Sequence, residues 1–228
     1  MVAVLPGFLL LVWLQNRKGM PLVHTENITD NCKLMVWELS ESEETLYRTL
    51  PLHANTEELL TISHPQKKRE WLAGRLVISK LVEQIGLPYR GLWKDEHGKP
   101  FLIGHPHFIS LTHTMDYIGA VLHPTRPIGI DMEKKHEKLL RTATKYLTDP
   151  ERELAGNRIE DLCALWCCKE ALYKLNGRKK ISFKDDIHVH PFRPDTPVTA
   201  GVLTDNGQSI TAELHLRWIG DYCLAVAL

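Results

Sequence analysis

The stretch that decides the fold is residues 162–176, LCALWCCKEALYKLN. Its apolar side chains recur at steps of three and four, the period of a helix with one face against a core. These side chains are Leu165, Cys168, Leu172 and Leu175. A second face carries Trp166, Glu170 and Lys174. The second face predicts either an exposed ion pair, worth a few tenths of a kcal/mol, or one wall of a site.

A second acidic pair lies about forty residues earlier, in residues 128–133, IGIDME. In a strand, alternate side chains point to opposite faces, so Gly129, Asp131 and Glu133 share one face. The two carboxylates are then about 7 Å apart along the backbone, which suits a shared divalent cation such as magnesium. We expect Gly129 to leave room for a ligand. An exposed strand face is the alternative.

Residues 108–114, FISLTHT, place an imidazole among hydroxyl groups. His113, together with Thr112 and Thr114, could donate hydrogen bonds to a phosphate. The alternative is a histidine whose hydrogen bonds are satisfied by the neighbouring backbone.

Composition sets bounds on the function. The chain has 228 residues, of which 43% are hydrophobic and 25% charged, as in ordinary globular proteins. Lysine plus arginine equals aspartate plus glutamate at 28 each, so no nucleic-acid-binding surface is implied. The five cysteines contain no CxxC pair, and we interpret them as reduced, packed thiols of a cytoplasmic protein. No membrane association is predicted.

Three regions are expected along the chain. Residues 1–19 include an apolar run too short to span a membrane, and we interpret them as a dispensable or non-native extension, with an N-terminal anchor as the alternative. Residues 20–124 form an N-terminal half, and residues 125–228 form a C-terminal half carrying the acids. The predicted fold is α+β, with two similar halves related by a pseudo-twofold duplication. Each half is a long helix packed on a small, mostly antiparallel sheet.

The pattern predicts the following elements. Helices are expected over residues 42–48, 67–85, 136–146, 149–156 and 159–176. Strands are expected over residues 33–39, 101–103, 107–112, 117–122, 128–133, 187–189, 210–219 and 222–228.

Five motifs in this order resemble the 4'-phosphopantetheinyl transferases, in particular the long, two-halved type that activates carrier domains of synthases. They are EWLAGR at 70–75, GKP at 98–100, SLTHT at 110–114, GIDME at 129–133 and WCCKEALYK at 166–174. The spacing between the last two motifs is the most specific part of the resemblance. The match covers the chain from about residue 33 to the C-terminus.

The resemblance implies a role for each residue. Asp131, Glu133 and Glu170 would hold magnesium against the pyrophosphate of coenzyme A. The catalytic residues would be Glu170, Lys174 and Asp131. The nucleotide part would be contacted by His113, Thr114, Arg75, Arg69, Lys67, Lys99 and Lys174. The role of Lys169 is left open.

The implied reaction is a magnesium-dependent transfer of 4'-phosphopantetheine from coenzyme A to a serine of an apo acyl or peptidyl carrier protein. Adenosine 3',5'-bisphosphate is released. We expect a monomer, because the second half replaces a second subunit. A basic segment could steer an acidic carrier, or could simply be a solvated helix face; it contains Lys134, Lys135, Lys138, Arg141 and Lys145.

Two other functions stay open at this stage. One is a catalytically silent module that binds coenzyme A or a nucleotide, and the other is a metal-dependent phosphohydrolase. The sequence does not identify the carrier protein, nor does it distinguish fatty-acid from polyketide or peptide synthesis.

Overall fold

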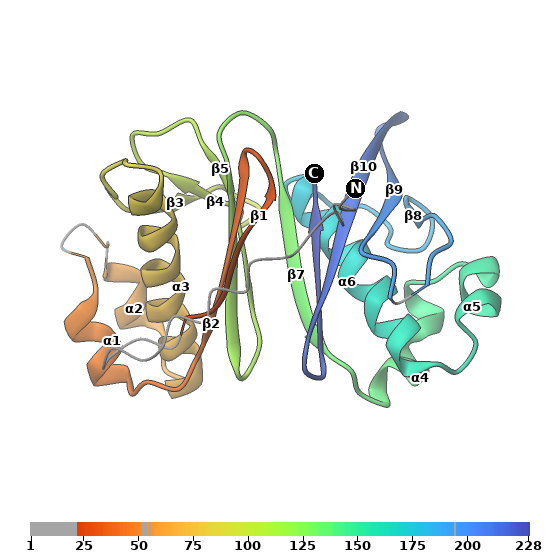
Figure 1. Ribbon diagram of the computed structural model, residues 1–228, viewed down its shortest axis with the longest axis horizontal. Helices are drawn as coiled ribbons and strands as arrows, with labels where there is room; N and C mark the ends of the chain where they lie inside the picture. Colours follow the sequence, from red (N-terminus) through yellow and green to blue (C-terminus); the bar gives the residue numbers. More distant parts are fainter. Residues whose placement is uncertain (1–21, 52–53, 55, 194) are drawn as a thin grey trace, which may run out of the picture.

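The computed structural model describes residues 22–51, 54, 56–193 and 195–228. Two sheets lie back to back at the centre, and helices cover the outer face of each sheet (Figure 1). This order of layers confirms the predicted α+β class, with a long helix on an antiparallel sheet in each half. The predicted N-terminal extension, residues 1–19, lies outside the described residues.

The first half holds one sheet and the long helix α3. Its elements are β1 (Leu22–Thr29), β2 (Cys32–Glu38), α1 (Glu43–Thr49), α2 (Glu57–Thr61), α3 (Pro65–Gln84), β3 (Leu92–Lys94), β4 (Pro100–Leu102), β5 (Phe108–His113) and β6 (Tyr117–His123). The sheet has the order β1-β2-β6-β5 with antiparallel pairing throughout. Strands β3 and β4 form a separate hairpin.

The second half holds a longer sheet and the helix α6. Its elements are β7 (Gly129–Lys134), α4 (Lys138–Thr142), the 3-10 helix η1 (Ala143–Lys145), α5 (Asp149–Ala155), α6 (Ile159–Leu175), β8 (Ile187–Val189), β9 (Val198–Asp205), β10 (Gln208–Ile219) and β11 (Tyr222–Ala227). The sheet order is β7-β11-β10-β9-β8, again antiparallel. The two halves share an architecture, while their descent from one duplicated unit stays a prediction.

Strand alternation explains how both faces of each sheet are buried. On β2, Met35 and Trp37 pack toward α3, whereas Leu34 and Val36 pack between the two sheets. Strand β7 contributes Ile130 to the same layer between the sheets. Side chains of a strand point alternately to its two faces, so apolar residues at every position bury both faces. The seam between the halves is therefore an apolar core with polar groups at its edge.

Two glycines allow α6 to lie close on its sheet. A Cβ atom at Gly129 would sit 1.9 Å from the backbone oxygen of Ala171, and one at Gly201 would sit 2.6 Å from the Leu172 side chain. The expectation that Gly129 leaves room for a ligand is therefore wrong. The space beside Gly129 is filled by the backbone of α6.

The structure departs from the predicted elements where local patterns are weak. The helix predicted over residues 136–146 is divided into α4 and η1. Strand β1 was not predicted because it is a polar edge strand, and edge strands need no apolar alternation. The predicted start of a helix at residue 149 is confirmed, since Thr148 and Glu151 form a capping box at the start of α5.

All five cysteines are free and buried, which confirms their interpretation as packed thiols. In the part of the chain that the structure describes, no helix has the length and apolar character needed to cross a membrane.

Candidate active site

Asp131 is the centre of the polar group at the seam. It lies on β7, on the face turned toward α6, and only 8% of its surface is exposed. Its Oδ1 accepts hydrogen bonds from Lys174 Nζ at 2.7 Å and from Thr112 Oγ1 at 3.1 Å. Lys174 Nζ also donates to the carbonyl oxygens of Ile130 at 2.9 Å and Leu111 at 3.4 Å. Strand β5, strand β7 and helix α6 therefore meet at one carboxylate.

Two further carboxylates lie within electrostatic reach of Asp131. Burial raises the pKa of Glu170 to about 7, and the charge of Asp131 is the next cause, while Lys174 acts in the opposite direction. Burial also raises the pKa of Glu133, and Asp131 again adds to the increase. Lys174 thus faces Asp131 and Glu170, and the charge of Asp131 opposes ionisation of both Glu170 and Glu133.

This donor set has the chemistry of a divalent cation site. Magnesium prefers carboxylate oxygens, and a cation would relieve the repulsion among Asp131, Glu133 and Glu170. Among the described residues, no three His, Cys, Asp or Glu side chains are already arranged to hold a metal ion. Asp131 is instead turned toward Lys174 and Thr112. The predicted set of three metal ligands stays a prediction, and it fits the residues by charge and donor type.

A second polar cluster borders the first. Glu70 on α3 accepts from Lys67 Nζ at 2.7 Å and lies 3.2 Å from His113 Nε2 at the end of β5. Lys67 Nζ and His113 Nε2 are 3.4 Å apart. Burial lowers the pKa of His113, while the charges of Glu70 and Asp131 act in the opposite direction. Lys67 and His113, both of which the resemblance implies as contacts of the nucleotide part, thus lie next to each other, and their role stays a prediction.

Two cavities open beside Glu133. The larger, of about 550 Å³, has apolar walls that include Tyr146, Trp166 and Phe183. Its rim is basic and includes Lys134, Lys138 and Lys145. The smaller, of about 240 Å³, lies between the halves, since His113 and Asp116 line one side and Met132 and Tyr222 the other. An elongated ligand with a charged middle could occupy space on both sides of Glu133.

Comparison with known proteins decides the family. Residues 127–227 match the 4'-phosphopantetheinyl transferase superfamily, and residues 55–123 match the 4'-phosphopantetheinyl transferase N-terminal domain. The chain belongs to the 4'-phosphopantetheinyl transferase superfamily.

Two relatives in this superfamily are the 4'-phosphopantetheinyl transferases AcpT of Salmonella typhi and of Salmonella typhimurium. The first is 29% identical over 124 residues, and the second is 28% identical over 119 residues. Each alignment covers 49% of this chain and 60% of the relative. The match thus takes in less than two thirds of either relative.

Not every residue expected to contact the nucleotide in this superfamily reaches the seam group. Arg75 is 8% exposed, stacks over the Trp71 ring at 3.2 Å and pairs with Glu58 at 2.8 Å. Arg69 donates to the backbone oxygens of Leu39 and Glu41 at 2.6 Å and 3.0 Å. The structure thus places these two arginines in contacts within the first half.

Lys99 and Thr114 have structural contacts next to the site. Lys99 Nζ donates to the Leu175 carbonyl oxygen at 3.3 Å, so the β3–β4 hairpin is tied to the end of α6. Burial lowers the pKa of this lysine. Thr114 Oγ1 accepts from the backbone N–H of Asp116 and Tyr117 at 3.2 Å and 2.9 Å, which holds the turn after His113.

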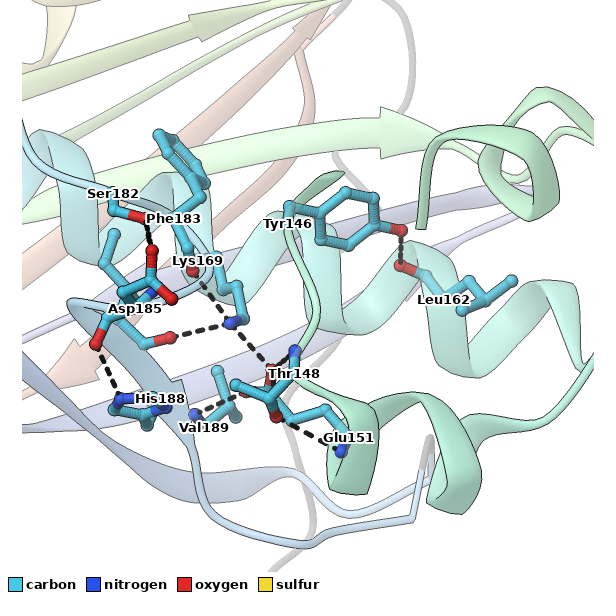
Figure 2. Close-up of polar contacts among 11 residues, drawn as sticks. Tyr146, Thr148, Glu151, Leu162, Lys169, Ser182, Phe183, Asp185, His188 and Val189 are labelled. Carbon is cyan, nitrogen blue, oxygen red and sulfur yellow. Dashed lines mark hydrogen bonds and ion pairs between the residues drawn. The ribbon is translucent and has the colours of Figure 1, made fainter. Parts of the chain in front are cut away.

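Lys169, whose role the sequence left open, points away from Asp131. Its side chain is 0% exposed, and its Nζ lies 2.8 Å from Glu151 Oε2. The same ammonium donates to the carbonyl oxygens of Phe183 at 2.9 Å and Ile187 at 2.6 Å. Figure 2 shows Lys169 directed at Glu151, whose carboxylate also accepts from Thr148 N at 2.8 Å and Val189 N at 3.2 Å. Lys169 therefore joins α6, α5 and β8.

Two residues of the site make contacts that the sequence did not predict. Thr112 was expected to face a phosphate, whereas it is 2% exposed and bridges Asp131 and the backbone N–H of Met132. The alternation of Thr112 with the apolar positions of β5 was the sequence signal that could have placed its side chain on a buried face. Glu70 lay inside a quoted motif but received no role, because nothing local shows that a residue of α3 faces His113.

Proposed function

We propose that this protein transfers the 4'-phosphopantetheine group of coenzyme A to a serine of an apo acyl or peptidyl carrier protein. The observation that carries the proposal is the 2.7 Å contact of Lys174 with Asp131, beside Glu133 and Glu170, whose pKa values are raised by burial and by the charge of Asp131. A buried lysine among several carboxylates suits a substrate that brings phosphate charge and a cation.

The reaction needs positioning and charge neutralisation more than a protein nucleophile. The serine Oγ attacks the β-phosphorus of coenzyme A and forms the new P–O bond. The bond from that phosphorus to the bridging oxygen breaks, and adenosine 3',5'-bisphosphate leaves with the bond's electron pair. Glu170 accepts the serine proton, directly or through water. Lys174, whose Nζ contacts Asp131 at 2.7 Å, would contact the pyrophosphate oxygens.

Asp131, Glu133 and Glu170 are the residues that would hold magnesium. When bound, the ion supplies neutralisation of phosphate charge next to the lysine. The three carboxylates would be its ligands and would hold the phosphate end of coenzyme A at the seam.

The larger cavity supports the choice of substrate. It begins at Glu133, has a volume of about 550 Å³ and is walled by Trp166 and Phe183. The pantetheine arm is a flexible chain of apolar and amide segments, and such ligands fit apolar cavities with a few polar groups. The rim lysines, Lys138 and Lys145 among them, offer positive potential to an acidic carrier protein.

A turnover assay tests the proposal. The purified chain is incubated with coenzyme A, magnesium and a panel of apo fatty-acid, polyketide and peptide carriers, and intact-mass spectrometry follows each carrier. We expect one phosphopantetheine group to be added to the carrier serine, with no addition in excess EDTA. A carrier whose serine is replaced by alanine is the matched control and should keep its mass.

The outcomes separate this function from its alternatives. Binding of coenzyme A without transfer to any carrier would identify a silent binding module. Release of adenosine 3',5'-bisphosphate in the absence of a carrier would identify a phosphohydrolase. The presence of all three acids together with Lys174 argues against a silent module.

We also propose that the protein acts as a cytoplasmic monomer. Five free, buried thiols are typical of a reducing compartment. Both halves of the seam come from one chain, so a second copy is not needed to build the site. Light scattering of the purified protein at several concentrations tests the monomer, and a constant dimer mass would contradict it.

A further inference from the structure

Glu70 is a buried acid that the proposed reaction does not use. Only 8% of its surface is exposed, although it lies near the start of a helix at the edge of the seam. Its Oε2 contacts two groups that can carry positive charge, Lys67 Nζ at 2.7 Å and His113 Nε2 at 3.2 Å. Burial and these two contacts fix the orientation of the Glu70 carboxylate.

The two partners of Glu70 are held close to each other. Lys67 Nζ and His113 Nε2 are 3.4 Å apart, so the ammonium would repel the imidazole whenever the imidazole is protonated. A carboxylate in contact with both groups offsets that repulsion. Without the charge of Glu70, the lysine would turn to solvent, because its side chain is 58% exposed.

The exposure of the three side chains is graded. The side chain of Glu70 is 9% exposed, whereas His113 is 47% and Lys67 is 58% exposed. The acid thus lies beneath, and the two cation-forming groups lie above it at the surface of the seam. An anion arriving from solvent meets the lysine and the imidazole before it meets the carboxylate.

We propose that Glu70 is a positioning residue that holds Lys67 and His113 together as a binding pair for a phosphate of the nucleotide part of coenzyme A. This inference rests on the proposed function for the identity of the ligand. Glu70 itself does not touch the substrate. It acts by keeping two donors at one point, so that binding does not have to order a flexible lysine.

Helix α3 contains a matched control for this arrangement. Lys80 and Glu83 have the same spacing as Lys67 and Glu70, and their charged atoms lie 2.8 Å apart. Their side chains are 38% and 51% exposed, and they lie at the other end of the helix. The second pair has the same local geometry without a buried acid or a histidine partner.

The test is calorimetric titration of coenzyme A into the full-length protein and its variants. Glu70→Gln should weaken binding about tenfold, the effect of losing one charge-assisted contact. Glu70→Asp should recover part of the affinity, and Glu83→Gln should bind as the wild type does. In a turnover assay with an apo carrier protein that the wild type modifies, Glu70→Gln should raise KM for coenzyme A and leave kcat within about twofold of the wild-type value.

A second variant guards against a trivial loss of folding. Lys67→Met should also weaken binding, and adding Glu70→Gln to it should have less effect than in the wild type, since the two act as one unit. Wild-type affinity or tighter binding in Glu70→Gln would overturn the proposal, as would strictly additive effects. Because binding is measured without a carrier, a wild type that binds coenzyme A but transfers nothing would overturn only the proposed reaction.

Discussion

Helix α6 carries two buried lysine–carboxylate pairs that look alike and differ in their surroundings. Lys169 lies 2.8 Å from Glu151, and Lys174 lies 2.7 Å from Asp131. Each ammonium also donates to two backbone carbonyl oxygens. The lysines are therefore equally well satisfied, and the difference lies with the acids.

The first pair is balanced. Glu151 is the acid that meets Lys169, and its oxygens accept from Thr148 and Val189 as well. Around the second pair, Glu133 and Glu170 add negative charge that one lysine does not neutralise. A balanced buried pair joins elements of the fold, whereas an unbalanced one is suited to bind a cation and phosphate.

The largest effect should separate catalysis from folding at the unbalanced pair. Glu170→Gln keeps the shape of the side chain and removes its capacity to accept a proton. We expect the transfer rate to fall about 10³-fold, within the usual range for loss of a general base. Circular dichroism should stay near that of the wild type. A variant that is active, or one that does not fold, would contradict the assigned role.

Breaking the balanced Lys169–Glu151 pair should lower the stability of the fold. Glu151→Ala leaves the Lys169 ammonium buried without its partner, and we expect the free energy of unfolding to fall by about 3–5 kcal/mol. Asp131→Ala is the matched change at the other pair. Since it removes one of several crowded acids, its loss of stability should be about 1 kcal/mol, while the magnesium dependence of transfer should weaken. Urea denaturation measures the loss of unfolding free energy in each variant. Equal losses in Glu151→Ala and Asp131→Ala would mean that the two pairs do not differ.

The close packing of α6 on β7 at Gly129 should contribute to stability and to the geometry of the nearby Lys174–Asp131 pair. Gly129→Ala places a Cβ atom against the backbone of Ala171, which cannot turn aside. We expect a loss of about 3 kcal/mol in unfolding free energy and reduced transfer. At Gly201 the nearest atom is the end of the Leu172 side chain, which can move. Gly201→Ala should therefore cost less, and the reverse order would refute this packing argument.

The smallest effect is a dependence of stability on pH. The pKa of Glu170 is raised from 4.5 to about 7 in the folded protein. The folded state therefore binds more protons than the unfolded state between these values, so its stability falls as pH rises through this range. With EDTA present, the wild type should lose about 2 kcal/mol relative to Glu170→Gln between pH 5 and pH 7.

Magnesium provides the control for that measurement. If the acids hold the ion, millimolar magnesium should remove the loss at pH 7 in the wild type and leave Glu170→Gln little changed. Thermal unfolding at matched ionic strength measures the difference. A wild type whose stability does not respond to magnesium would count against Glu170 as a ligand.

Much of the architecture could be predicted from the sequence, because it depends on short-range periodicity. The apolar steps of Leu165, Cys168 and Leu172 predicted the buried stripe of α6, and all three are buried. Alternation in residues 128–133 separated Asp131 from Ile130, as β7 does. Strand β1 was missed because its apolar side chains are few.

Other features were decided only by the tertiary structure. Lys169 and Lys174 are five residues apart and chemically identical, and nothing local predicts that one meets Glu151 and the other Asp131. The role of Glu70 and the filling of the space at Gly129 depend equally on which element lies opposite. The physical reason is that periodicity assigns a side chain to a face, whereas charge balance and close contact are properties of the residues that packing brings to that face.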